Sequence, residues 1–167
     1  MRKILNYFTK AEKILWVTST LMILLSFVIS QDSGILGLVA SLIGVTALIL
    51  CAKGNPSGQI LMIIFCCIYT YISYTCSYYG EMITYACMSL PMAVFSLVSW
   101  LRHPFKGNKA EVKVNHIKNK EYIFLVVLDI AVTVIFYFIL RYFDTANLFF
   151  STISITTSFG AAYLTMR

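Results

Sequence analysis

The sequence predicts an all-α protein that crosses a membrane six times, and two observations carry this prediction. Apolar residues make up 59% of the 167-residue chain and charged residues 12%, so a soluble domain of this composition would be coated in exposed hydrocarbon. The apolar residues also form runs close to the roughly 20 residues that a helix needs to cross the hydrocarbon core. These runs are 14–30, 34–52, 59–79, 82–101, 122–140 and 148–166.

The basic residues predict the orientation of these helices. When the runs are threaded alternately through a bilayer, starting with the N-terminus inside, Arg141 is the only one of the 13 Lys and Arg residues that falls outside. Because cytoplasmic loops carry an excess of Lys and Arg, both termini and the basic segment 102–120 are predicted to be cytoplasmic. We therefore expect a multi-pass protein of the cell (cytoplasmic) membrane.

The second and third spans carry distinctive side chains. Small residues lie along one side of the second span and predict close helix packing; they are Gly34, Gly37, Ser41 and Gly44. The third span begins with Gln59, whose amide needs a partner inside the membrane. Tyr71 and Tyr74 share a face of this span with Tyr78. A stacked ligand ring and simple helix packing both explain them, and the sequence leaves these alternatives open.

The last three spans contribute further polar groups. Glu81 lies at the outer turn before the fourth span, and Pro91 in its middle frees a backbone carbonyl. Asp129 is the one carboxylate well inside a predicted span. Since a buried carboxylate is costly, we expect either a functional role or a hydrogen bond between helices. Thr156 lies on the small-residue side of the sixth span, which predicts close packing or, alternatively, a hydroxyl-lined pathway.

Similar residues recur in the two halves of the chain. Glu121 opens the fifth span 109 positions after Glu12 opens the first, and Ser-Thr-Ile-Ser-Ile-Thr at 151–156 aligns with Ser-Leu-Ile-Gly-Val-Thr at 41–46. The repeat predicts one transmembrane domain built on a plan of three helices, one helix and three helices, with the last helix missing. Its parts are a first bundle at 12–79, a linker helix at 82–101, a basic cytoplasmic loop at 102–120 and an incomplete second bundle at 121–167.

No group of side chains is arranged for catalysis. The five cysteines form no CxxC pair and have no histidine at metal-ligand spacing, so they are interpreted as packing residues. The sequence pairs no nucleophile with a base and contains no phosphate-binding glycine loop. We therefore expect no enzyme, no cofactor and no metal ion. The net charge of +6 lies on the cytoplasmic flanks, so the expected partner is the lipid bilayer and not nucleic acid.

Several short motifs occur in one order along nearly the whole chain. They are Ala52-Lys-Gly-Asn55, Tyr71-Ile-Ser-Tyr74, Tyr78-Tyr-Gly-Glu-Met82, Leu90-Pro-Met92, Trp100, Ser154-Ile-Thr-Thr-Ser158 and Ala161-Ala-Tyr-Leu164. In these motifs the chain resembles the PnuC family of nicotinamide riboside transporters. The resemblance implies the same helix plan and facilitated diffusion of nicotinamide riboside or a related vitamin or nucleoside. It also implies recognition by amide and aromatic side chains near the middle of the membrane.

The candidate substrate-binding residues that follow are Gln59, Tyr71, Tyr74, Glu81, Trp100 and Thr156. The chain also departs from the pattern of many relatives. It has Tyr85 where they carry asparagine, Ala93 where they carry glutamine and Leu97 where they carry tryptophan. These changes leave the identity of the substrate open.

The expected truncation suggests a second hypothesis, a non-transporting truncated copy or an accessory membrane subunit. A second bundle that lacks its third helix lacks one wall of a closed pathway, so we expect the chain alone to transport poorly. Association with further copies of the chain is also compatible with the sequence.

The predicted orientation is testable by labelling a single cysteine. With the native cysteines replaced, Asn108→Cys in the basic loop should be shielded from an impermeant thiol reagent in intact cells, because this loop follows an even number of spans. It should react once the cells are opened. Modification in intact cells would contradict the orientation.

Overall fold

The computed structural model describes residues 8–29, 34–105, 108–112, 119–144 and 148–166. Its helices are α2 (Lys10–Ile29), α3 (Ile35–Ala52), α4 (Pro56–Thr75), α5 (Tyr79–Ile83), α6 (Leu90–Arg102), α7 (Asn119–Tyr142) and α8 (Leu148–Met166). A π-helical segment, η1 (Thr84–Ser89), joins α5 to α6, so these three elements form one continuous helix. The all-α transmembrane fold class is thus confirmed.

A small strand pair in the basic loop is the one addition to this class within the described residues. Strands β1 (Pro104–Phe105) and β2 (Asn108–Val112) run antiparallel. The pair lies beyond the end of α6, outside the apolar runs. The composition of this basic segment gave no signal of it.

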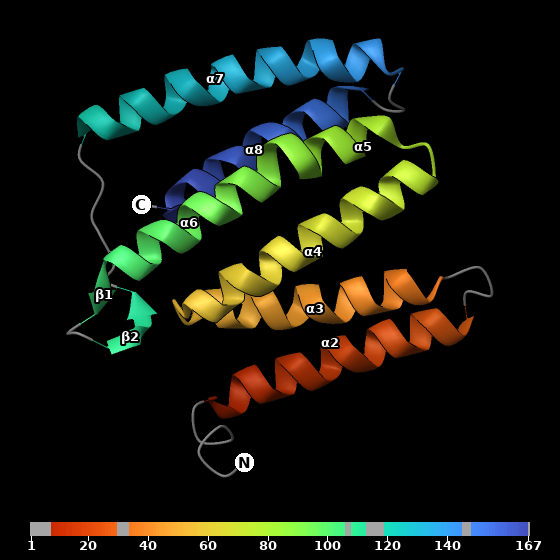
Figure 1. The fold of residues 1–167 in the computed structure, drawn as a ribbon, viewed down its shortest axis with the longest axis vertical. Coiled ribbons are helices and arrows are strands. Elements are labelled where there is room, and N and C mark those ends of the chain that lie inside the picture. Colours follow the sequence, from red (N-terminus) through yellow and green to blue (C-terminus); the bar gives the residue numbers. More distant parts are fainter. Residues whose placement is uncertain (1–7, 30–33, 106–107, 113–118, 145–147, 167) are drawn as a thin grey trace.

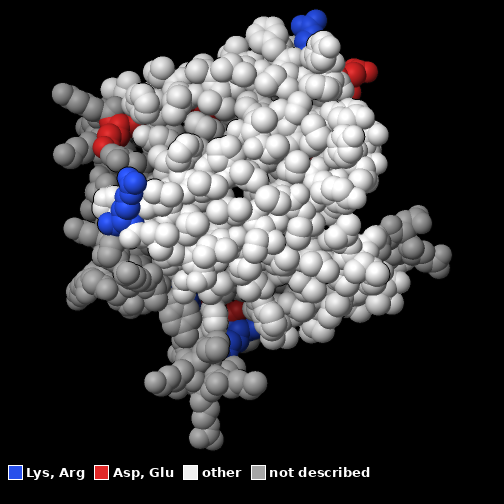
Figure 2. All heavy atoms as spheres, viewed as in Figure 1, with Lys and Arg blue, Asp and Glu red and all other residues white. Residues whose placement is uncertain are grey.

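Five helical stretches in the described part of the chain are long and apolar enough to cross a membrane. They are Lys10–Ile29, Ile35–Ala52, Pro56–Thr75, Tyr79–Arg102 and Glu121–Tyr142. The predicted sixth span forms helix α8 with the expected bounds, and α8 is not among these five stretches. Figure 2 shows a broad uncharged face with charged side chains near the ends of the helices.

The helices lie side by side in an order that differs from their order in the chain (Figure 1). Helix α2 packs on α3, and α3 packs on α4. Helix α4 packs on the continuous helix formed by α5, η1 and α6, which we call the long helix. The α6 part of the long helix packs on α8, and α8 packs on α7. Much of the outer surface is apolar, and Ile14, Val28 and Ile29 of α2 are 67%, 77% and 79% exposed. Exposed apolar area of this extent is typical of side chains that contact lipid.

The beginning of α2 is held by two polar contacts. Thr9 and Glu12 form a reciprocal cap, in which each backbone N–H donates to the other's side chain, so the helix begins earlier than the predicted residue 14. The Glu12 carboxylate also lies 3.0 Å from the Lys53 ammonium at the end of α3. Deeper in the membrane, Trp16 Nε1 donates to Thr46 Oγ1 at 3.3 Å. These contacts fasten α2 to α3.

The bounds of α4 differ from the predicted 59–79 at both ends. The helix begins at Pro56, because Asn55 Oδ1 accepts the Ser57 N–H and the proline ring presets the first turn. It ends at Thr75, and Ser77 follows with a φ of 61°. That left-handed residue turns the chain into α5. Local cap and turn geometry therefore decided both ends, and the run of apolar residues did not.

The long helix connects the two sides of the molecule. Met88 of η1 packs in a buried cluster with Phe136 and Leu140 of α7 and with Ile155 and Phe159 of α8. At the other end, the buried Trp100 donates from Nε1 to the Thr165 carbonyl of α8 at 2.7 Å. The long helix thus fixes α8 at two levels.

The predicted three-one-three plan and its division at 12–79, 82–101, 102–120 and 121–167 stay predictions. One pair of repeat-related positions behaves alike in the structure. Thr46 accepts a hydrogen bond from Trp16 of α2, and Thr156 bonds Thr133 of α7 at 2.9 Å. In each half of the chain, a threonine of the second helix (α3 or α8) hydrogen-bonds a side chain of the helix before it (α2 or α7).

Close packing of α3 on α4 at Gly58 predicts a strong effect of an added methyl group. A Cβ on Gly58 would lie 2.6 Å from the Cys51 backbone nitrogen and 2.9 Å from the Ala47 oxygen. Gly58→Ala should therefore cost about 1 to 3 kcal/mol by overpacking. Thermal unfolding of the detergent-solubilised protein would measure it.

The matched control is Gly37→Ala on α3, where a Cβ meets nothing within 4 Å. This variant should unfold at or slightly above the wild-type midpoint, since alanine favours helix more than glycine. Equal unfolding midpoints for the two variants would show that the close approach at Gly58 does not limit the stability of the protein.

Candidate functional site

A cavity of about 760 Å³ opens where α4 passes into α5 and α7 passes towards α8. This volume lies in the range of small-molecule binding sites, roughly 300 to 1,000 Å³. Its lining comes from α4, the turn into α5, α5 itself, η1, the end of α7 and α8. The residues are Tyr69, Ser77, Tyr78, Tyr79, Gly80, Glu81, Thr84, Tyr85, Met88, Ser89, Leu140, Phe143, Asp144, Ser151, Ser154, Ile155 and Ser158.

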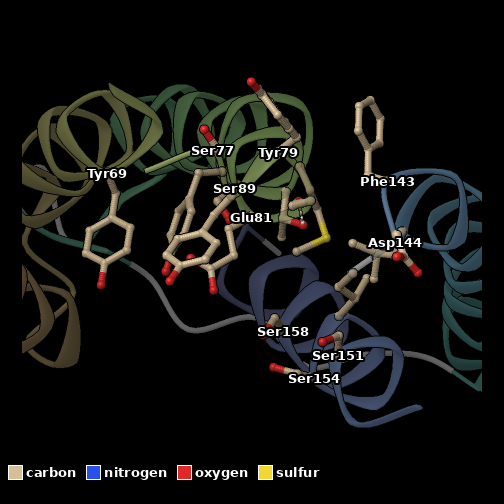
Figure 3. A pocket seen from close by; sticks show the side chains of 17 residues that line it. Tyr69, Ser77, Tyr79, Glu81, Ser89, Phe143, Asp144, Ser151, Ser154 and Ser158 are labelled. Carbon is tan, nitrogen blue, oxygen red and sulfur yellow. Dashed lines mark hydrogen bonds between the residues drawn. The ribbon is translucent and has the colours of Figure 1, made fainter. Parts of the chain in front are cut away.

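Hydroxyl groups line one wall of the cavity. Ser151, Ser154 and Ser158 are spaced three and four residues apart, so α8 presents them on a single face. Figure 3 shows them on α8, across the cavity from Tyr69 of α4. Hydroxyls both donate and accept hydrogen bonds, which makes this wall suited to a solute that itself carries hydroxyl groups.

Aromatic rings line the opposite wall. Tyr69 of α4 and Tyr85 of η1 pack with ring centroids 4.7 Å apart and planes tilted by 44°. Both side chains are half-buried, so each ring keeps part of its surface free of protein contacts. The wall offers ring faces to a ligand together with phenolic hydroxyls.

The charged groups in the cavity wall are acidic. Glu81 of α5 and Asp144, just after α7, both line it and are exposed, and the described lining residues include no Lys or Arg. Asp144 has a φ of 48° and donates its backbone N–H to the Arg141 carbonyl at 3.2 Å, so a tight turn at the end of α7 holds it there. The cavity is therefore electrostatically suited to a cation.

Glu81 is the sequence-predicted site residue that the structure brings to this cavity. Gln59 is 4% exposed near the opposite end of α4, and Trp100 is buried and bonded to α8. Thr156 bonds Thr133 between α7 and α8.

The two predicted aromatic residues of α4 lie apart from the cavity. Tyr71 and Tyr74 are 57% and 60% exposed and are not among the lining residues. The structure thus does not bring Gln59, Tyr71, Tyr74, Trp100 and Thr156 together with Glu81 in one wall. The assignment of all these residues to substrate binding stays a prediction.

Sequence reasoning missed most of the cavity wall. The spacing of Ser151, Ser154 and Ser158 was a usable signal, because it defines one helix face. Tyr69 and Tyr85 gave no comparable signal, since only the packing of α4 against η1 turns both rings to the same place. Asp144 depends on the turn after α7, which the sequence did not specify.

Asp129 lies outside this cavity, between α7 and α8. Its Oδ1 atom is shielded from solvent and has no hydrogen-bond partner, and its Oδ2 atom lies 3.9 Å from where a Cβ on Gly160 would stand. The structure therefore shows no interhelical hydrogen bond at Oδ1. A functional role for Asp129 stays a hypothesis.

Residues 34–167 match the family described as nicotinamide mononucleotide transporter. The chain belongs to this family. A nicotinamide riboside transporter PnuC from Neisseria mucosa is 31% identical over 87 residues. That segment is 52% of the present chain and 33% of the relative, so the match spans about a third of the relative's length.

The solved structure of the vitamin B3 transporter PnuC has the same fold. It superposes with a TM-score of 0.76 at 23% sequence identity and matches 95% of this chain and 68% of its own. The resemblance seen in the sequence motifs is thus confirmed at the level of family and fold. With its family and its apolar helices, the chain is a multi-pass membrane protein.

The cavity predicts a difference in water access along α8. With the five native cysteines replaced, Ser158→Cys should react with a charged methanethiosulfonate reagent applied to both sides of reconstituted vesicles, because thiolates form in water. The control is Leu164→Cys, a position that is 49% exposed and outside the cavity lining. It should remain unmodified in lipid, and equal labelling of both would contradict a water-filled cavity.

Proposed function

We propose that the chain binds and moves a cationic nucleoside, nicotinamide riboside or a close relative, across the cell membrane by facilitated diffusion. One observation carries this proposal: the cavity combines ring faces, a serine wall and two carboxylates. Nicotinamide riboside has matching groups, a planar ring with a positive charge and a sugar with hydroxyls. The names of the family and of the Neisseria relative support the same class of solute.

The charge of the cavity favours the riboside over the mononucleotide. A phosphate ester adds about two negative charges at pH 7. Two like charges 4 Å apart repel by about 1 kcal/mol in water and about 4 kcal/mol near a protein surface. Since Glu81 and Asp144 line the cavity without a Lys or Arg among the described lining residues, a phosphate there would meet repulsion and no counter-charge.

In the proposed complex each wall has one task. The serines of α8 hydrogen-bond the sugar hydroxyls, the tyrosines contact the ring, and the carboxylates lower the energy of the cation at the mouth. The proposal places both termini in the cytoplasm and the cavity mouth outside, supported by the distribution of Lys and Arg. No chemical change of the solute is part of this proposal. Because the solute is a cation, its concentration gradient and the membrane potential together set the direction of movement.

The test is binding of the two solutes to the purified chain. Nicotinamide riboside should bind at least about tenfold more tightly than the mononucleotide, because about 1.4 kcal/mol of repulsion gives that ratio. The double variant Glu81→Gln, Asp144→Asn should lose most of this preference. Glu121→Gln, at the start of α7 and outside the cavity, is the matched control and should keep it.

Entry of radiolabelled nicotinamide riboside into vesicles then separates transport from binding. Saturable entry supports the transporter. Binding without entry would favour the alternative of a truncated copy or an accessory subunit. Absence of binding, or tighter binding of the mononucleotide, would overturn the proposal.

A further inference from the structure

Three aromatic rings form a cluster that ends in the cavity wall, with two pairs tilted by 37° and 44° and the Phe65–Tyr85 pair edge to face at 78°. Phe65 lies 5.2 Å from Tyr69 and 6.0 Å from Tyr85, measured between ring centroids, and Tyr69 lies 4.7 Å from Tyr85. All three distances fall in the range in which aromatic pairs attract, roughly 4.5 to 7 Å. Tyr69 and Tyr85 line the cavity, whereas Phe65 does not, so Phe65 supports the other two from behind.

The cluster packs against a glycine of α3. A Cβ on Gly44 would lie 3.1 Å from Cε2 and 3.2 Å from Cδ2 of Phe65, which is tighter than ordinary contact. The absence of a side chain at Gly44 is therefore what lets the Phe65 ring lie against α3. Contacts run without a break from α3 through Phe65 to the cavity wall.

Tyr85 belongs to this cluster and lies in the π-helical segment η1. Such wide turns are rare within helices and occur frequently at functional sites. Here η1 supplies Thr84, Tyr85, Met88 and Ser89 to the cavity. Its backbone thus presents Tyr85 to Tyr69 while Met88 still packs against α7 and α8.

We propose that Tyr69 and Tyr85 form the surface on which the planar cationic ring of the solute stacks, and that Gly44 and Phe65 are positioning residues for it. The inference rests on the proposed function and assigns the specificity of the same cavity. A ring face attracts a cation within about 6 Å, so the pair discriminates a charged aromatic ring from an uncharged, non-aromatic one. The serine wall makes no such distinction.

The experiment compares two solutes that differ in the ring alone. Nicotinamide riboside carries a positively charged aromatic ring, and its dihydro form is uncharged and non-aromatic. Tyr69→Ala and Tyr85→Ala should each weaken binding of the riboside about tenfold or more, the scale of losing one stacked ring, and affect the dihydro form less. Tyr85→Phe keeps the ring and should retain the preference for the charged form.

Gly44→Ala tests the positioning role. It should lower the ratio of riboside to dihydro affinity, because it displaces Phe65 and with it the pair, whereas a general loss of structure would weaken both solutes alike. Tyr122→Ala, an exposed tyrosine at the start of α7, is the matched control and should leave the ratio unchanged. Where an alanine variant fails to purify, leucine at the same position keeps most of the volume without the ring.

A third probe, 1-methylnicotinamide, separates failure of this inference from failure of the proposed function. Riboside binding that Tyr69→Ala and Tyr85→Ala leave intact would overturn the stacking surface and retain the function. Tyrosine-dependent binding of 1-methylnicotinamide without binding of the riboside would retain the surface and overturn the function. Absence of binding of both probes to the wild-type chain would overturn both.

Discussion

Away from the cavity, no water meets a polar group inside the hydrocarbon layer, so each hydroxyl there depends on a partner within the protein. Most of the described threonines there bond back to their own helix, as Thr70 does to the Cys66 carbonyl at 2.7 Å, and Ser41 does the same to the Gly37 carbonyl at 2.8 Å. Few threonine hydroxyls thus use their proton to join helices. Close apolar contact therefore carries most of the packing, and the approach of α4 to α3 at Gly58 is its tightest point among the glycines described.

The long helix from α5 to α6 shows how this constraint leads to a cavity. Its side chains pack against α4 on one side and against α8 on the other. The π-helical segment in its middle turns Tyr85 towards α4 and places Met88 in the cluster with α7 and α8. This one irregular segment thus contacts α4 through Tyr85 and contacts α7 and α8 through Met88. The cavity lies between α4 on one side and α7 and α8 on the other.

The helices were predictable from the sequence, whereas most of the cavity was not. Apolar runs are a local property, and α8 has the bounds of its run, 148–166. Which tyrosine of α4 lines the cavity is not decided by the local sequence. Tyr69 and Tyr71 are two positions apart, which is more than half a turn of helix, so only the packing of α4 against η1 decides that Tyr69 lines the cavity while Tyr71 is 57% exposed. Glu81 was found because it lies in a turn between two spans.

The two carboxylates of the cavity wall also bear on how a cation would approach the cavity. Carboxylates beside a low-dielectric body concentrate field lines at an opening and raise the local concentration of cations there. Glu81 and Asp144 occupy such a position. Their reach is about one Debye length, roughly 8 Å in physiological salt and about 30 Å at 0.01 M. If the proposed function holds, capture of the cationic solute at this opening should be fastest in dilute surroundings and should slow as ionic strength rises.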